Sequence, residues 1–363
     1  MRADGNERRL GPRGPFPDGA AAGLTGGPLE RQWLHYALLS RSGDVAVIAN
    51  LSTLGADRPD EPAHRRGIVL AHDQESGWEA SQFNARQQQV PWSSFRLPQP
   101  RAAQGGKGPF NVAAVSGSPA LEVTLRSTSQ ACTSQCAPFG DGEFLRWQSE
   151  PGVLGAGMVT VHGRSRWVEL TGYHERVRGR WSWPALGGWV FGFVNAPHSE
   201  RADSAADSSA AENVQGPPPA AVVFTLIQPR FPDDAANGSV MLWREGRLWR
   251  HFPRRCLQMA VDGALARDDV VLVPPLAGLL DTPSCATVPG RLVISARMGQ
   301  DHLLLDFTSR TAGRIANPCE RGLRPFSVHE TLGPCRVEAR VSGRHLEFET
   351  QGIVEFAGGA DDL

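Results

Sequence analysis

The residues best suited to chemistry lie in one 28-residue stretch, 168–195. It holds three of the ten tryptophans and one of the two tyrosines, Tyr173, which is followed directly by His174 and Glu175. Aromatic walls beside a few ionisable groups can hold an apolar molecule and transfer a proton to it. The same composition is typical of paired strands with a tryptophan-rich core. Both interpretations stay open on these residues alone.

An internal repeat links the two halves of the chain. Residues 161–175 align without gaps on residues 341–355, and Val, Gly, Arg, Glu, Gly and Glu recur at the same six places. Glu175 therefore has a counterpart in Glu355. A repeat spaced by half the chain indicates two similar domains rather than a solenoid. A glutamate that recurs in this way can serve the architecture of the strand as well as chemistry.

Short β-prone runs separated by turn residues extend along the chain, and convincing amphipathic helices are scarce. Hairpins are predicted around Gly43-Asp44 and around Glu245-Gly246. The pattern and the repeat predict an all-β fold with two β-barrel or β-sandwich domains in tandem. The expected limits are a disordered tail at 1–28, an N-terminal domain at 29–200, a linker or long loop at 201–220, and a C-terminal domain at 221–363.

Composition excludes several functions. A formal net charge of -1 gives no nucleic-acid footprint. No apolar run is long enough to span a membrane, and the N-terminus has no secretory apolar region. We therefore expect a cytoplasmic protein whose six cysteines are mostly free thiols.

Motifs for bound groups are missing as well. The cysteines match no zinc pattern, and His72-Asp73 and His329-Glu330 are isolated polar pairs, so we predict no metal. No nucleotide-binding loop and no Gly-x-Ser-x-Gly elbow occurs, so we predict no cofactor. The expected partner is a hydrophobic small molecule, and the oligomeric state is not predicted.

The central block carries a recognisable motif. Tyr173-x-Glu175 is followed by a glycine, a proline and an aromatic run, and a Trp-x-x-Tyr pair lies near the start. These motifs resemble the tocopherol cyclase and carotenoid 1,2-hydratase (hydroxyneurosporene synthase) group of lipocalin-like proteins, to which lipocalin-like Diels–Alderases are also similar. Val177 and Arg178 replace an Asn-Trp pair of that group. The matching positions are Trp33, Tyr36, Tyr173, Glu175, Gly179, Pro184, Trp189, Phe191 and Asn195.

The resemblance implies that the two predicted domains are lipocalin-like (calycin) β-barrels or β-sandwiches. It also implies a cofactor-independent cyclase or hydratase that acts on a polyene, prenyl or polyketide-like substrate. Glu175 fills the acidic position of the motif and is expected to donate a proton, with Tyr173 or His174 orienting it. A carboxyl kept neutral by an apolar wall is a suitable acid. In a regular strand, Tyr173 shares the face of Glu175 and His174 points to the opposite face. The expected substrate-binding residues are Trp33, Tyr36, Trp181, Trp183, Trp189 and Asn195.

Two alternatives remain on the sequence. A pericyclic enzyme would need no acid, only a site that holds the folded substrate in a reactive conformation. A non-catalytic lipocalin-like carrier of a lipid or pigment would use the same apolar interior. Judged without the resemblance, a glutamate such as Glu175 is most often a surface residue.

Overall fold

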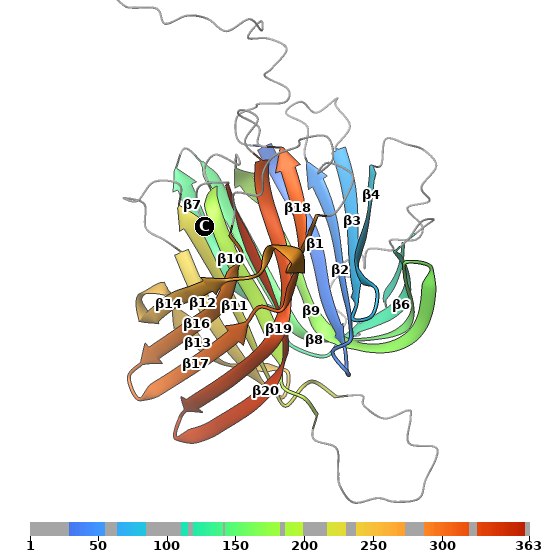
Figure 1. Ribbon diagram of the computed structural model, residues 1–363. Helices are drawn as coiled ribbons and strands as arrows, with labels where there is room; N and C mark the ends of the chain where they lie inside the picture. Colours follow the sequence, from blue (N-terminus) through green and yellow to red (C-terminus); the bar gives the residue numbers. More distant parts are fainter. Residues whose placement is uncertain are drawn as a thin grey trace, which may run out of the picture.

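A computed structural model describes residues 29–54, 64–84, 110–114, 119–140, 142–181, 186–198, 216–229, 237–272, 287–318 and 325–359. Within these ranges the chain forms two curled β-sheets and two single 3₁₀ turns, η4 (Arg254–Cys256) and η5 (Arg267–Asp269), with no α-helix (Figure 1). The predicted all-β fold with two lipocalin-like units in tandem is confirmed. None of the described segments is a helix able to cross a membrane. The predicted tail at 1–28 lies outside the described residues.

The first sheet is antiparallel, with the strand order β4-β3-β2-β1-β9-β8-β6-β5, and β7 pairs with one end of β8. Its strands are β1 (Leu29–Ser40), β2 (Val45–Leu54), β3 (His64–Asp73), β4 (Gly77–Asn84), β5 (Phe110–Ala114), β6 (Ala120–Ser127), β7 (Cys132–Gly140), β8 (Glu143–Val161) and β9 (Arg164–Trp181).

The second sheet has the order β13-β12-β11-β10-β20-β19-β17-β16-β14; β18 pairs with β19, and β15 lies parallel to β18. Its strands are β10 (Leu186–Asn195), β11 (Ala220–Pro229), β12 (Asn237–Arg244), β13 (Arg247–Pro253), β14 (Leu257–Ala264), β15 (Val270–Leu272), β16 (Pro289–Met298), β17 (Asp301–Thr308), β18 (Thr311–Pro318), β19 (Pro325–Val341) and β20 (Arg344–Gly359).

The two sheets repeat one topology. β4-β3-β2-β1-β9-β8-β6-β5 in the first corresponds strand for strand to β13-β12-β11-β10-β20-β19-β17-β16 in the second, and β7 corresponds to β18. The sequence repeat covers the turns of the long hairpins β8–β9 and β19–β20 and most of the second strand of each. Their turns, His162-Gly163 and Ser342-Gly343, all have positive φ, a conformation that favours glycine at the second position. The repeated glycine thus marks a tight turn in each half.

β10 joins the second sheet, although the sequence analysis placed it in the N-terminal domain. It pairs with β11 on one side and β20 on the other. The Ser/Ala-rich segment after residue 198 therefore connects two adjacent antiparallel strands of one sheet. Composition marks such a segment as a connection, but it does not reveal which strands pair across it. The domain limits given above remain predictions.

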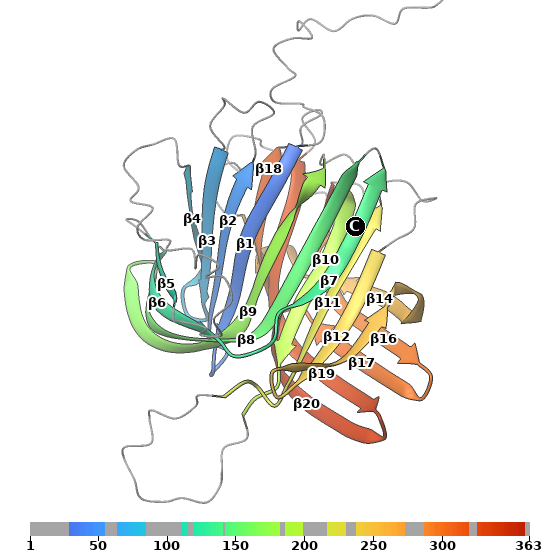
Figure 2. The ribbon, with the colours of Figure 1, turned by 180° about the vertical axis from the view of Figure 1, so that it is seen from behind.

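Each sheet has its own apolar core, and a third core lies between the sheets. At this inter-sheet core β10 lies against β8 and β9, β11 against β7 and β8, and β1 against β20. Figure 2 gives the view of these strands from behind. Residues of both halves therefore meet in one buried layer. Its buried aromatic members are Trp78, Trp147, Tyr173, Trp181, Trp189, Phe191, Phe193 and Trp243.

Candidate active site between the sheets

Glu175 lies in the inter-sheet core. It sits on β9 with β1 on one side and β8 on the other, opposite His35 and Ser149. Because side chains alternate along a strand, Tyr173 and Val177 share its face, and both belong to the inter-sheet core. Only 3% of Glu175 is exposed. A glutamate this deeply buried needs polar partners.

Three neutral hydrogen-bonding groups surround the Glu175 carboxyl. Trp33 Nε1 donates to Oε1 at 2.8 Å, and Trp147 Nε1 donates to Oε2 at 2.7 Å. The Tyr173 hydroxyl lies 2.9 Å from the same Oε2. None of these partners is a cation, so burial is not offset by an ion pair.

The pKa of Glu175 is raised to about 8. Burial is the largest cause because it disfavours the charged form, and the nearby carboxyl of Glu355 raises it further. The hydrogen bonds from Trp33, Tyr173 and Trp147 oppose the shift. Glu175 is therefore a neutral acid at neutral pH, the state in which a carboxyl can donate a proton.

A chain of hydroxyl groups leads away from Glu175. Tyr173 Oη lies 2.8 Å from Ser149 Oγ, Ser149 donates to Ser134 Oγ at 2.9 Å, and Ser134 donates to the carbonyl of Trp147 at 3.3 Å. When Glu175 carries a proton, its own O–H can donate to Tyr173, whose single proton is then directed to Ser149. Burial raises the pKa of Tyr173 well above its usual value, so this hydroxyl stays protonated. The chain orients the acid of Glu175.

Aromatic rings enclose the acid. Trp33 lies edge-on to Trp147 and Trp181, with ring centroids 6.2 and 5.5 Å apart, and lies nearly parallel to Trp189 at 6.3 Å. Phe191 contacts both Trp147 and Tyr173. A ring face attracts a cation by about 0.5–2 kcal/mol. The cluster can therefore stabilise a positive charge that develops beside Glu175.

His174 and Tyr36 lie on the opposite face of the first sheet. The two rings stack with centroids 4.2 Å apart, and His174 Nδ1 lies 3.0 Å from the backbone carbonyl of His35. Burial lowers the pKa of His174 to about 4, so it is neutral. Tyr36 belongs to the core inside the first sheet. The pleat of β1 and β9 separates this predicted pair from Glu175.

The remaining predicted substrate-binding residues differ in their distance from Glu175. Trp181 and Trp189 join the inter-sheet core, whereas Trp183 lies outside the described residues. Asn195 Nδ2 donates to the carbonyl of Gly172 at 2.9 Å, which ties β10 to β9. Asn195 thus contacts the strand that carries Glu175 without reaching its carboxyl.

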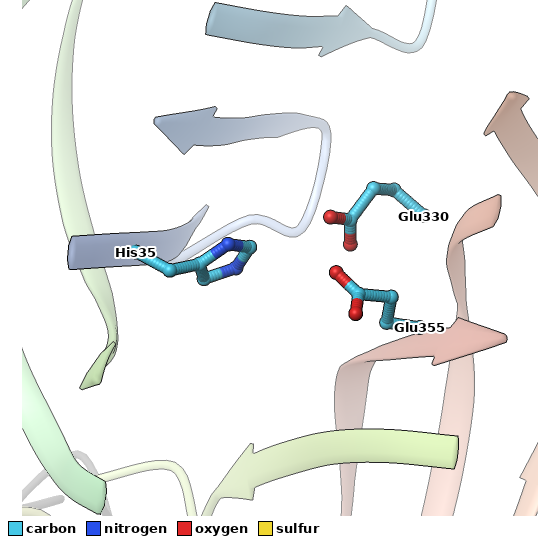
Figure 3. Close-up of side chains that lie close together, drawn as sticks. All are labelled: His35, Glu330 and Glu355. Carbon is cyan, nitrogen blue, oxygen red and sulfur yellow. The ribbon is translucent and has the colours of Figure 1, made fainter. Parts of the chain in front are cut away.

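A second polar group occupies the second half of the same core. Glu355 accepts a hydrogen bond from Trp189 Nε1, as Glu175 does from Trp33, and Glu355 also bonds to Glu330. His35 reaches this pair from β1, and the candidate ligand atoms of these three residues lie within 4.8 Å of one another (Figure 3). Sequence reasoning named Glu355 only as a repeat and set Glu330 aside. The strand register could have identified Glu330. The hairpin β19–β20 is equivalent to β8–β9, and Glu330 lies directly opposite Glu355 in it, so both side chains face the same core.

Comparisons with known proteins give the fold. The sequence matches no protein-family model and no curated protein sequence. Among solved structures it is similar to a Nitrosomonas europaea protein provisionally assigned as AttH, with 13% identity, 92% of this chain and 93% of that chain covered, and a TM-score of 0.54. It is also similar to kievitone hydratase from Nectria haematococca, with 12% identity, 95% of this chain and 93% of that chain covered, and a TM-score of 0.53. A third similar structure is CghA with Sch210972, with 8% identity, 92% of this chain and 89% of that chain covered, and a TM-score of 0.50. At these identities the likeness concerns the fold.

Proposed function

We propose that this protein is a cofactor-independent enzyme of the hydratase or cyclase type. Its substrate is a hydrophobic polyene, prenylated or polyketide-like molecule with an electron-rich alkene. Glu175 protonates one alkene carbon, and the positive charge forms on the other. The observation that carries this proposal is a buried, neutral carboxyl held by two indole donors and one hydroxyl group inside a cluster of tryptophans.

Each neighbour of Glu175 has a role in the proposal. Tyr173 and Ser149 orient the acidic proton, and the Glu175 carboxylate takes it back in the reverse step. Trp33, Trp147, Trp181 and Trp189 lie around the charge and exclude water from it. The similarity in fold to a protein named kievitone hydratase supports a hydratase type, and the motif resemblance supports the same reaction class.

The test uses solvent deuterium. An ortho-prenylated phenol carries a trisubstituted alkene and a hydroxyl group, and reversible protonation in D₂O places deuterium on an alkene carbon. Wild type is expected to catalyse this incorporation, and Glu175→Gln is expected to lose it because an amide cannot supply the proton. Glu169→Gln is the matched control, since Glu169 lies on the same strand with 49% of its side chain exposed.

Two other outcomes would overturn the acid mechanism. Turnover by Glu175→Gln at the wild-type rate would favour a pericyclic reaction, in which shape alone orders the substrate. Recovery of the bound molecule unchanged, with no deuterium in any protein variant, would favour a carrier.

A further inference from the structure

His35, Glu330 and Glu355 form a cluster, here called the oxygen site, that the proton transfer by Glu175 does not use. His35 comes from β1, and Glu330 and Glu355 come from the paired strands β19 and β20. Figure 3 shows the imidazole directed toward the two carboxyls. All three side chains are more than nine-tenths buried. The cluster joins the two sheets across the inter-sheet core.

The hydrogen bonds of His35 settle its protonation. Asn50 Nδ2 lies 3.4 Å from His35 Nδ1, and the amide oxygen of Asn50 is occupied by Ser52 Oγ at 2.7 Å. With the Asn50 amide in this orientation its Nδ2 is the donor, so Nδ1 of His35 accepts and the hydrogen of the neutral ring is assigned to Nε2. Burial lowers the pKa of His35 to about 3, so the ring is neutral. Its Nε2 has no hydrogen-bond partner in the described part of the chain.

The two carboxyls share hydrogen. Glu330 and Glu355 bond to each other, which requires at least one proton on the pair, and burial raises the pKa of both. Trp189 donates to Glu355 Oε1. Glu330 Oε2 is left without a hydrogen-bond partner among the described residues. A buried donor on His35 and a buried acceptor on Glu330 thus each lack a partner among the described residues, in side chains whose candidate ligand atoms lie within 4.8 Å of one another.

We propose that the oxygen site binds one hydroxyl group and takes its proton while the oxygen adds to the substrate. A hydroxyl oxygen accepts from His35 Nε2–H, and its hydrogen points to Glu330 Oε2. A carbonyl could use only the first of these contacts, and a metal ion would require the hydrogen to move from Nε2 to Nδ1, which faces the amide donor of Asn50. A neutral O–H group is the chemistry that satisfies both atoms.

This inference rests on the proposed function and supplies its second step. Glu175 gives its proton to one alkene carbon, and the π electrons form the new C–H bond. The hydroxyl oxygen then forms the C–O bond at the other carbon, and its proton passes to the singly protonated Glu330–Glu355 pair. The pair gains the one proton that Glu175 loses, so charge and atoms balance. Trp33 donates a hydrogen bond to Glu175, and Trp189 donates one to Glu355. The two indole rings are neighbours in the core, so the two steps take place close together.

The oxygen has two possible sources that share this chemistry. Water gives hydration, and a hydroxyl group of the substrate itself gives ring closure. The repeat argues that the site is specific to one half: the position equivalent to His35 is Phe191, and the position equivalent to Glu330 is Ser149. The same strands therefore fold without these polar groups, and His35→Phe is a substitution that the chain already accommodates in its other half.

The first test needs no substrate. A high-resolution crystal structure of the full chain is expected to contain an ordered water within hydrogen-bond distance of both His35 Nε2 and Glu330 Oε2, and metal analysis of the same protein is expected to find no stoichiometric metal. A stoichiometric divalent cation at the three residues would overturn the proposal, and so would a direct hydrogen bond between His35 and Glu330.

The second test separates this inference from the acid role of Glu175. An ortho-prenylated phenol is incubated in D₂O and, separately, in H₂¹⁸O with wild type, Glu175→Gln, Glu330→Gln and His35→Phe. Glu330→Gln and His35→Phe are expected to lower product formation at least tenfold while deuterium still enters the alkene of recovered substrate. Label from H₂¹⁸O in the product identifies water as the oxygen, and unlabelled cyclic product identifies the phenol hydroxyl.

The outcomes distinguish the two proposals. Product at the wild-type rate from both Glu330→Gln and His35→Phe, with Glu175→Gln inactive, would overturn the oxygen site and leave the acid in place. Full activity of Glu175→Gln would overturn the proposed function. The control Glu349→Gln, on β20 with 76% of its side chain exposed, is expected to match wild type.

Discussion

The two halves of the molecule share a scaffold and differ in the polar groups placed on it. Each half directs a glutamate into the inter-sheet core from an equivalent strand, β9 in the first half and β20 in the second. Each glutamate accepts a hydrogen bond from a tryptophan on the neighbouring strand. In the first half, Glu175 is surrounded by neutral indole and hydroxyl groups. In the second half, Glu355 faces another carboxyl, Glu330. Duplication thus fixes where the carboxyl lies, and its neighbours decide what it can do.

The largest expected difference between the halves is in proton donation. Glu175→Gln should reduce deuterium incorporation about 10²–10⁴-fold, the usual contribution of a general acid. Glu355→Gln should retain incorporation and lose C–O bond formation. Mass spectrometry of recovered substrate and product measures both. Equal loss of incorporation in the two variants would show that the halves do not divide the chemistry.

The second prediction concerns stability and pH. The pKa of Glu175 is about 8 in the folded protein against 4.5 ordinarily, so the folded state keeps a proton that the unfolded chain loses. Wild-type stability contributed by this group is therefore greatest below pH 4.5 and falls as the pH rises to about 8. Glutamine does not titrate. The free energy of unfolding of Glu175→Gln relative to wild type should rise by about 4–5 kcal/mol across that window.

Denaturant unfolding at pH 5 and pH 8.5 should record about 4 kcal/mol of this shift. Tyr173, Glu330 and Glu355 face the same core, but they are present in both proteins, so their direct contributions cancel in the difference. A difference that does not change with pH would mean that Glu175 titrates normally in the folded state.

The third prediction compares the two tryptophan donors. Trp33→Phe leaves Glu175 Oε1 without its indole donor and should cost about 1–3 kcal/mol of folding free energy. It should also raise the pKa of Glu175, because this hydrogen bond lowers it. The alkaline limit of activity should then move to higher pH. Trp189→Phe should leave that limit nearly unchanged, and an equal shift in both variants would contradict the assignment of one donor to each glutamate.

The smallest expected effect is a loss of folding stability that should be equal in the two halves. Gly163 and Gly343 both have φ of +76° at equivalent hairpin turns, and an added Cβ meets no atom within 4 Å at either. Replacing either by alanine should cost about 1–2 kcal/mol through backbone strain alone. Thermal or denaturant unfolding should give the same loss for both. Clearly unequal losses would indicate that the two turns are not equivalent.

The sequence was sufficient for the fold and for half of the site. Alternating strands and turn residues predicted the all-β architecture, and the Tyr173-x-Glu175 spacing placed two partners on one face. It could not locate His35, Glu330 or Trp147, because their proximity depends on strand register and on the packing of two sheets. Tyr36 was predicted in the site from the Trp-x-x-Tyr motif, and His174 was predicted to orient the acid although the strand alternation directs it to the opposite face. The structure places both residues on that opposite face. β10 was assigned to the first half because composition does not encode pairing.

The central claim is that Glu175 is a neutral acid in the folded protein at neutral pH. Difference infrared spectroscopy of wild type against Glu175→Gln isolates the carboxyl stretch of this residue. We predict a protonated-carboxyl band at pH 7 that is lost in the variant and that disappears in wild type as the pH rises through about 8. A carboxylate band from Glu175 at pH 7, with no protonated band lost in the variant, would contradict the claim.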